Sequence, residues 1–158
     1  MAIVNIRDTG RNSAKTTDVR ELAEKVQKPS DTEAITAANT ITAAESGTRY
    51  VLNVAAAKIQ TLPAPAAGLE YWFYVGATEP TGTHTVVTAS SANIIVGNIS
   101  SPEDAAGSVA TVTDADTISF VANKAVHGDF AHVWSDGTNW YLDGMCKVQD
   151  GITTTQAG

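Results

Sequence analysis

Short apolar stretches recur at roughly ten-residue intervals from residue 34 to the C-terminus, with clusters of turn-forming residues between them. The stretches are rich in β-branched and aromatic residues, whereas glycine, proline, aspartate and serine fill the intervals. Strands at this spacing predict an all-β domain, either a β-sandwich or a β-barrel, that ends in a strand end and a tail over residues 151–158. The predicted strands are Thr40–Ala43, Arg49–Val54, Lys58–Leu62, Leu69–Val75, His84–Ala89, Asn93–Val96, Val109–Val112, Thr117–Val121, Phe130–Ser135 and Asn139–Leu142.

The strand at Leu69–Val75 is continuously apolar after its second residue, which predicts a central strand covered on both sides. Successive strand residues face opposite sides, so at least one of its four consecutive aromatic residues points away from any single core. Aromatic residues are enriched in protein interfaces. We therefore assign Tyr71, Trp72 and Tyr74 to an oligomer or partner interface, with stacking on a sugar as the alternative.

The segment 130–144, FAHVWSDGTNWYLDG, places a histidine, a serine and an aspartate within five positions. Asp136-Gly137 between two β-forming runs is a strong hairpin signal, because glycine adopts positive φ at little cost. In a strand His132 and Ser135 face opposite sides, and four residues separate His132 from Asp136 by about 13 Å. A catalytic triad requires contacts of about 2.6–3.2 Å. The segment therefore predicts a structural hairpin.

The chain divides into an N-terminal arm at 1–16, a short helix and linker at 17–33, and a β-rich domain at 34–158. The arm is polar and lacks periodicity, apart from an apolar start at Ile3, Val4 and Ile6, so we expect that it does not fold alone.

Residues 17–28, TDVRELAEKVQK, predict an amphipathic helix that ends before Pro29. Val19, Leu22 and Val26 form its apolar stripe. A helix of about three turns is marginal alone in water, so the stripe needs a surface to pack against. These three residues are candidate interface residues that dock on the same chain, the favoured alternative, or on another chain.

Charge is unevenly distributed along the 158 residues. Residues 1–33 hold six basic and six acidic groups, whereas residues 34–158 hold four basic and eleven acidic groups and carry the whole net charge of −7. Nucleic-acid binding requires basic groups that neutralise phosphates, so we expect no nucleic-acid partner. The apolar runs are too short to span a bilayer, and the N-terminus lacks the apolar centre of a signal peptide, so we expect no membrane partner.

We expect neither a metal nor another cofactor. The single cysteine, Cys146, and the histidines His84, His127 and His132, interpreted as exposed strand or loop residues, show no spacing typical of metal ligands. Asp114 and Asp116, like Glu103 and Asp104, are better explained by turns than by cation binding. No nucleotide-binding or hydrolase motif is present, and we expect that the chain is not an enzyme.

Four stretches together resemble virion proteins of tailed bacteriophages, with the closest similarity to small decoration (cement or head-stabilising) proteins. They are TLPAPAAGLEYWFYVGA, HTVVTASSANIIVGNI, DTISFVANKAVHGDFAHVWSDGTNWYLDG and CKVQDGITT. The likeness covers roughly residues 35–155 in order. It implies a non-enzymatic β-rich protein, often a homotrimer, that binds the major capsid protein on the outer surface of the head after synthesis in the bacterial cytoplasm, and that bridges capsomers.

The resemblance suggests a role for the arm. Ile3, Val4 and Ile6 would add to the edge of a capsid sheet, where main-chain hydrogen bonds supply affinity. Arg7 and Arg11 would pair with capsid carboxylates, and three arms of a trimer would multiply weak contacts.

Two other classes of function remain. A tail-fibre or spike module would bind host-surface glycans through Trp72, Trp134 or Trp140, although the chain is short and lacks a coiled-coil shaft. A hydrolase or lyase would need clustered acid and base groups, which the sequence does not indicate.

Overall fold

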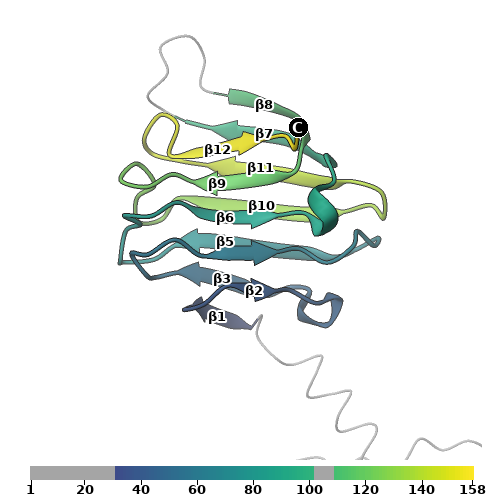
Figure 1. Cartoon of the computed structure of the whole chain (residues 1–158), viewed down its shortest axis with the longest axis horizontal. Helices are drawn as coiled ribbons and strands as arrows, with labels where there is room; N and C mark the ends of the chain where they lie inside the picture. The colour runs from purple at the N-terminus through teal and green to yellow at the C-terminus, as the bar shows by residue number, and fades with distance from the viewer. Residues whose placement is uncertain (1–30, 102–108) are drawn as a thin grey trace, which may run out of the picture.

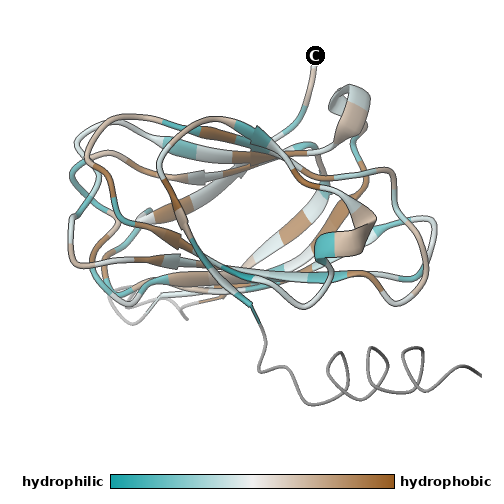
Figure 2. Ribbon diagram, turned by 90° about the horizontal axis from the view of Figure 1, so that it is seen from below, coloured by the Kyte–Doolittle hydropathy of each residue, from teal (hydrophilic) through white to brown (hydrophobic). Residues whose placement is uncertain are grey.

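The computed structural model describes residues 31–101 and 109–158, which form two mixed β-sheets packed face to face (Figures 1 and 2). The large sheet has the strand order β1 (Thr32–Ile35), β3 (Arg49–Leu52), β5 (Glu70–Val75), β10 (Phe130–Ser135), β11 (Trp140–Met145), β7 (Ile95–Ser100) and β8 (Val109–Ala115). The small sheet has the order β12 (Ile152–Thr155), β9 (Thr117–Phe120), β6 (His84–Val87), β4 (Ile59–Thr61) and β2 (Asn39–Thr40). Two 3-10 turns, η1 (Ala43–Glu45) and η2 (Ala89–Ser91), connect strands. The all-β prediction is confirmed.

The first half of the domain winds alternately through the two sheets. Strands β1, β3 and β5 lie side by side in the large sheet, while β2, β4 and β6 lie side by side in the small one. All neighbouring pairs within these two groups are parallel. Between two strands of one sheet, the chain passes through a strand of the other sheet. This crossover allows successive strands of the same sheet to run in the same direction. The N-terminal strand β1 therefore lies at one edge of the large sheet (Figure 1).

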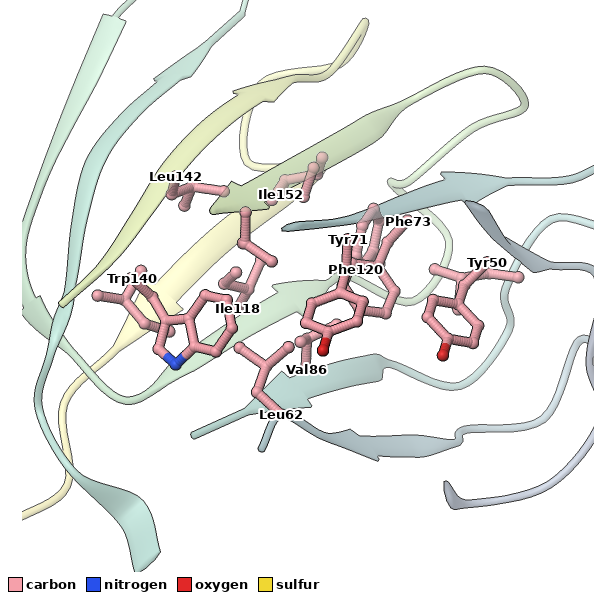
Figure 3. Packing of buried hydrophobic residues seen from close by; sticks show 14 of the residues in the cluster. Tyr50, Leu62, Tyr71, Phe73, Val86, Ile118, Phe120, Trp140, Leu142 and Ile152 are labelled. Carbon is pink, nitrogen blue, oxygen red and sulfur yellow. The ribbon is translucent and has the colours of Figure 1, made fainter. Parts of the chain in front are cut away.

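A hydrophobic cluster of aliphatic and aromatic side chains fills the space between the sheets (Figure 3). Tyr50 stacks on Phe73 with ring centroids 5.3 Å apart, and Tyr71 lies 5.8 Å from Trp140. These four side chains have no exposed surface. The phenol of Tyr71 donates to the carbonyl of Thr42, so its polar end is satisfied inside the core. Burial raises the pKa of Tyr71 to about 12.

Buried polar side chains join the loops to this framework. His84, which the sequence places at an exposed position, is instead buried in β6. Its Nδ1 accepts from the Lys58 amide at 3.0 Å, so Nε2 carries the proton and donates to the Val54 carbonyl at 2.8 Å. The prediction was wrong because the strand turns this face of β6 inward, and two backbone partners replace water. Buried Asp129 similarly accepts from the amides of Val126 and Lys147, and burial raises its pKa.

Three other expectations differ from the structure. The sheet begins with β1 at Thr32, two residues before the predicted domain start at 34, because pairing with β3 recruits a sequence too polar to signal a strand. At the other end, β12 forms a full strand at Ile152–Thr155. Strand β5 is not covered on both sides by the described residues: its side chains alternate between buried and half-buried or exposed.

Gly97 in β7 occupies a position that only glycine can fill without rearrangement. Its φ is +149°, and it lies at a bulge where the pairing of β7 with β8 shifts register. A Cβ atom added there would lie 2.0 Å from the carbonyl oxygen of Leu142 on the adjacent strand β11. This contact is with backbone, so relief would require the two strands to separate.

We expect G97A to lower the free energy of unfolding by at least about 3 kcal/mol, because backbone strain and strand separation add. Urea denaturation followed by near-ultraviolet circular dichroism measures the change. G158A is the control, since a Cβ at this terminal position meets open space. An unfolding midpoint for G97A equal to that of G158A would contradict the assignment.

Candidate functional site

Aromatic residues cover the outer side of the large sheet, on the three central strands β5, β10 and β11. Because neighbouring residues alternate, the strands that bury Tyr71, Phe73, Val133 and Trp140 also turn a second set of side chains outward. We call this second set the outer aromatic face; it consists of Trp72, Tyr74, Phe130, His132, Trp134 and Tyr141. All are half-buried except Trp134, which is 44% exposed.

The rings of this face pack on one another across the strands. His132 lies opposite Trp72 in the register of β10 and β5, and the two rings stack at 3.8 Å with planes 10° apart. Trp72 is also nearly parallel to Tyr74, at 5.9 Å and 6°. On the other flank, Trp134 stacks on Tyr141 at 4.3 Å and 16°. Much of the ring surface is therefore already occupied by neighbouring rings.

Carboxylates lie on both sides of His132. Its Nε2 lies 3.4 Å from Oε2 of Glu70, and on the opposite strand β11 its register partner is the exposed Asp143. Arg49 of β3 is the register partner of Trp72. An apolar centre with charged residues around it is the usual arrangement of a surface that packs against protein.

The turn between β10 and β11 is held by Asp136. Its Oδ1 accepts from the amides of Thr138 and Asn139 at 2.8 and 2.9 Å, and its Oδ2 accepts from the Tyr141 phenol at 3.0 Å. Gly137 has φ +101°, as the hairpin prediction requires. The hydrogen bonds from Asn139, Thr138 and Tyr141 lower the pKa of Asp136. The turn thus positions one member of the outer aromatic face.

The predicted hairpin is confirmed. His132 points to the outer face, whereas Ser135 is buried on the inner face, and Asp136 lies in the turn. The three residues therefore do not form a catalytic set.

Among the predicted interface residues, Trp72 and Tyr74 lie together on the outer face. Tyr71 does not: it has no exposed surface and its phenol binds within the core, so its assignment to an interface is corrected. The alternation of β5 separates it from its two neighbours. The arm residues Ile3, Val4, Ile6, Arg7 and Arg11 and the stripe residues Val19, Leu22 and Val26 lie outside the described residues.

Sequence reasoning did not assign Phe130, His132 or Tyr141 to the same surface as Trp72. The signal that could have found them is the period-2 pattern, in which β5, β10 and β11 each place an aromatic residue or a histidine opposite the buried side. The pairing of β5 with β10 and of β10 with β11, which brings them together, is set by contacts distant in sequence.

Within residues 31–101 and 109–158, no cluster of three or more histidine, cysteine, aspartate or glutamate side chains is arranged to bind a metal ion. Cys146 is buried. The same residues contain no helix that is both long and apolar enough to cross a membrane. The chain matches no family model, no curated protein and no solved structure.

We expect D136N to remove a pH-dependent contribution of the turn to stability. The pKa of Asp136 is lower in the folded protein than the unfolded value of about 3.9. Its carboxylate therefore stabilises the fold above that unfolded value, and the contribution is lost as pH falls through the lowered pKa. The difference in urea midpoint between wild type and D136N should be largest near pH 6 and shrink below pH 4.

D114N is the control for this prediction, because it removes an exposed carboxylate from β8, outside the hairpin and the outer aromatic face. This variant keeps the Asp136 turn, so we expect it to keep the pH-dependent contribution of that turn. A constant difference between wild type and D136N from pH 2 to pH 6 would show that the carboxylate does not stabilise the turn.

Proposed function

We propose that this chain is a non-enzymatic structural protein that decorates the outer surface of a tailed-phage capsid. The β-rich domain is the body of the decoration, and the N-terminal arm is the segment that binds the major capsid protein. Three bodies associate as a homotrimer, so that three arms bridge neighbouring capsomers.

The observation that carries the proposal is where the N-terminal segment joins the sandwich. The core of the described domain is built from residues between Ile35 and Ile152. Residues 1–30 precede this core and join it at the open edge of the large sheet, through β1. An arm attached in this way is free to bind a partner at no cost to the core of the body.

Charge and sequence resemblance support the same function. The β-rich domain carries the whole net negative charge, which keeps separate bodies soluble and suits a surface that faces away from packaged DNA. The four stretches that resemble decoration proteins include β5 and the β10–β11 hairpin, which form the centre of the large sheet.

We expect replacement of Ile3, Val4 and Ile6 by serine to abolish binding to capsids, because the apolar part of the arm supplies the contact. Cosedimentation with empty, undecorated heads of the phage that encodes the chain measures bound copies per shell. Replacement of Asn5, Thr9 and Asn12 by serine is the matched control and should leave binding intact. Wild-type copy number should follow the threefold positions of the lattice, and an unchanged occupancy of the apolar variant would refute the role of the arm.

A second candidate function is binding of host-surface glycans by a fibre or spike module. The observation that favours it is Trp134, which is 44% exposed and stacked on Tyr141, next to the exposed carboxylates Glu70 and Asp143. Sugars stack on free aromatic faces and hydrogen-bond to nearby carboxylates. Against it, Trp72 and His132 cover each other at 3.8 Å, which leaves less free ring surface than a sugar platform requires.

We therefore expect no saturable binding of the wild-type protein to an array of bacterial surface polysaccharides. If binding is found, W134A tests whether Trp134 is responsible for it. M145A is the matched control, because it also removes an exposed apolar side chain from the same side of the hairpin. Binding that is lost in W134A and kept in M145A would establish the glycan function in place of capsid decoration.

A further inference from the structure

The outer aromatic face is an unusual surface for an isolated domain. It gathers five aromatic residues and His132 on three adjacent strands, and Met145 beside them is 42% exposed. Contiguous apolar surface of this kind on a soluble domain marks a site that something covers. Continuous apolar runs, such as the one in β5, are also typical of strands that are buried on both sides.

The N-terminal segment enters the sheet level with the centre of this face. Register pairs form one row across the sheet, from Thr32 to Arg49, Trp72, His132 and Asp143. Thr32 begins β1, so the chain reaches the sheet at the end of the row that contains the Trp72–His132 stack. Neighbouring strands are about 4.8 Å apart, which places β5 about 10 Å and β11 about 19 Å from β1.

The segment that precedes β1 has the length needed to cover this row. Residues 17–28, as a helix, would extend about 18 Å at 1.5 Å per residue. Residues 29–31 connect the helix to β1 and can span about 10 Å. The end of such a helix therefore reaches the strands β3 and β5, and its length is enough to cross the roughly 10 Å from β5 to β11.

The side chains of the segment are also complementary to the face. At 3.6 residues per turn, Val19, Leu22 and Val26 share one side, with Arg20 toward one flank and Lys25 and Asp18 on the other. Glu24 lies on the opposite side of the helix, and Glu21 lies about as far from the stripe as Arg20 does. On the sheet, the exposed carboxylates Glu70 and Asp143 flank the apolar rings. Arg20 and Lys25, one toward each flank, are thus the basic residues of the segment that can pair with these carboxylates.

We propose that residues 17–28 pack as an amphipathic helix on the outer aromatic face of their own chain. The stripe covers Trp72 and its ring neighbours, and Arg20 and Lys25 lie near the carboxylates. This covering buries the centre of the large sheet, at β5, β10 and β11, on both sides.

Quenching of tryptophan fluorescence by iodide in the full-length chain tests this packing. The background substitution W134F removes the most exposed indole and leaves Trp72 on the face and Trp140 in the core. The test variant combines Leu22→Ser with Val26→Ser. The matched control combines Glu21→Ser with Lys28→Ser, which changes two residues that lie away from the stripe and likewise leaves the net charge unchanged.

We expect the stripe variant to increase the Stern–Volmer constant at least twofold, because Trp72 becomes accessible, while the control matches the W134F parent. Amide hydrogen exchange of residues 17–28 should accelerate at least tenfold in the stripe variant alone. Equal quenching of parent, stripe variant and control would overturn the proposal. Protection of Trp72 that disappears on dilution, in step with dissociation of an oligomer in sedimentation velocity, would also overturn it and would assign the face to a second copy.

Discussion

Burial of every second residue of the central strands between the two sheets is the constraint on which the rest of this structure depends. Phe73, Tyr50, Tyr71 and Trp140 are joined by successive ring contacts in the interior, the first stacked and the other two tilted, and have no exposed surface. Strand geometry then leaves no choice for the residues between them, because neighbours must point to the opposite side. The outer aromatic face is thus a consequence of the core together with the aromatic composition of β5 and β10.

The path of the chain also determines where the residues before β1 join the large sheet relative to the outer aromatic face. The N-terminal half alternates between the sheets and builds two parallel groups of three strands. This path puts β1 at an edge of the large sheet, where the preceding residues join it level with the Trp72–His132 stack. The core residues lie between Ile35 and Ile152, so the proposed binding by residues 1–16 would not involve the packing that holds the domain together.

Individual residues show how far sequence reasoning extended. The hairpin at 130–144 was predictable because Asp136-Gly137 acts locally: the carboxylate accepts from amides two and three residues ahead. The local sequence does not indicate that His84 is buried, because its hydrogen-bond partners, Lys58 and Val54, lie 26 and 30 positions away. Strand β1 was missed for a similar reason, since its stability comes from pairing with β3 and not from its own composition. The continuous apolar run of β5 assigns Tyr71 and Trp72 to the same interface, and only the position of the core shows that Tyr71 is buried while Trp72 faces outward.

The sequence by itself determined the all-β class, most strand positions, the hairpin turn and the contrast between a charge-balanced N-terminal segment and an acidic body. These properties follow from local chemistry: period-2 burial, turn residues and charge. The tertiary structure decided which strands are neighbours, which half of each aromatic run lies inside, and that residues from β5, β10 and β11 share one outer surface. Such features arise from contacts between residues far apart in the chain, and a linear pattern does not encode strand order because many pairings satisfy the same alternation.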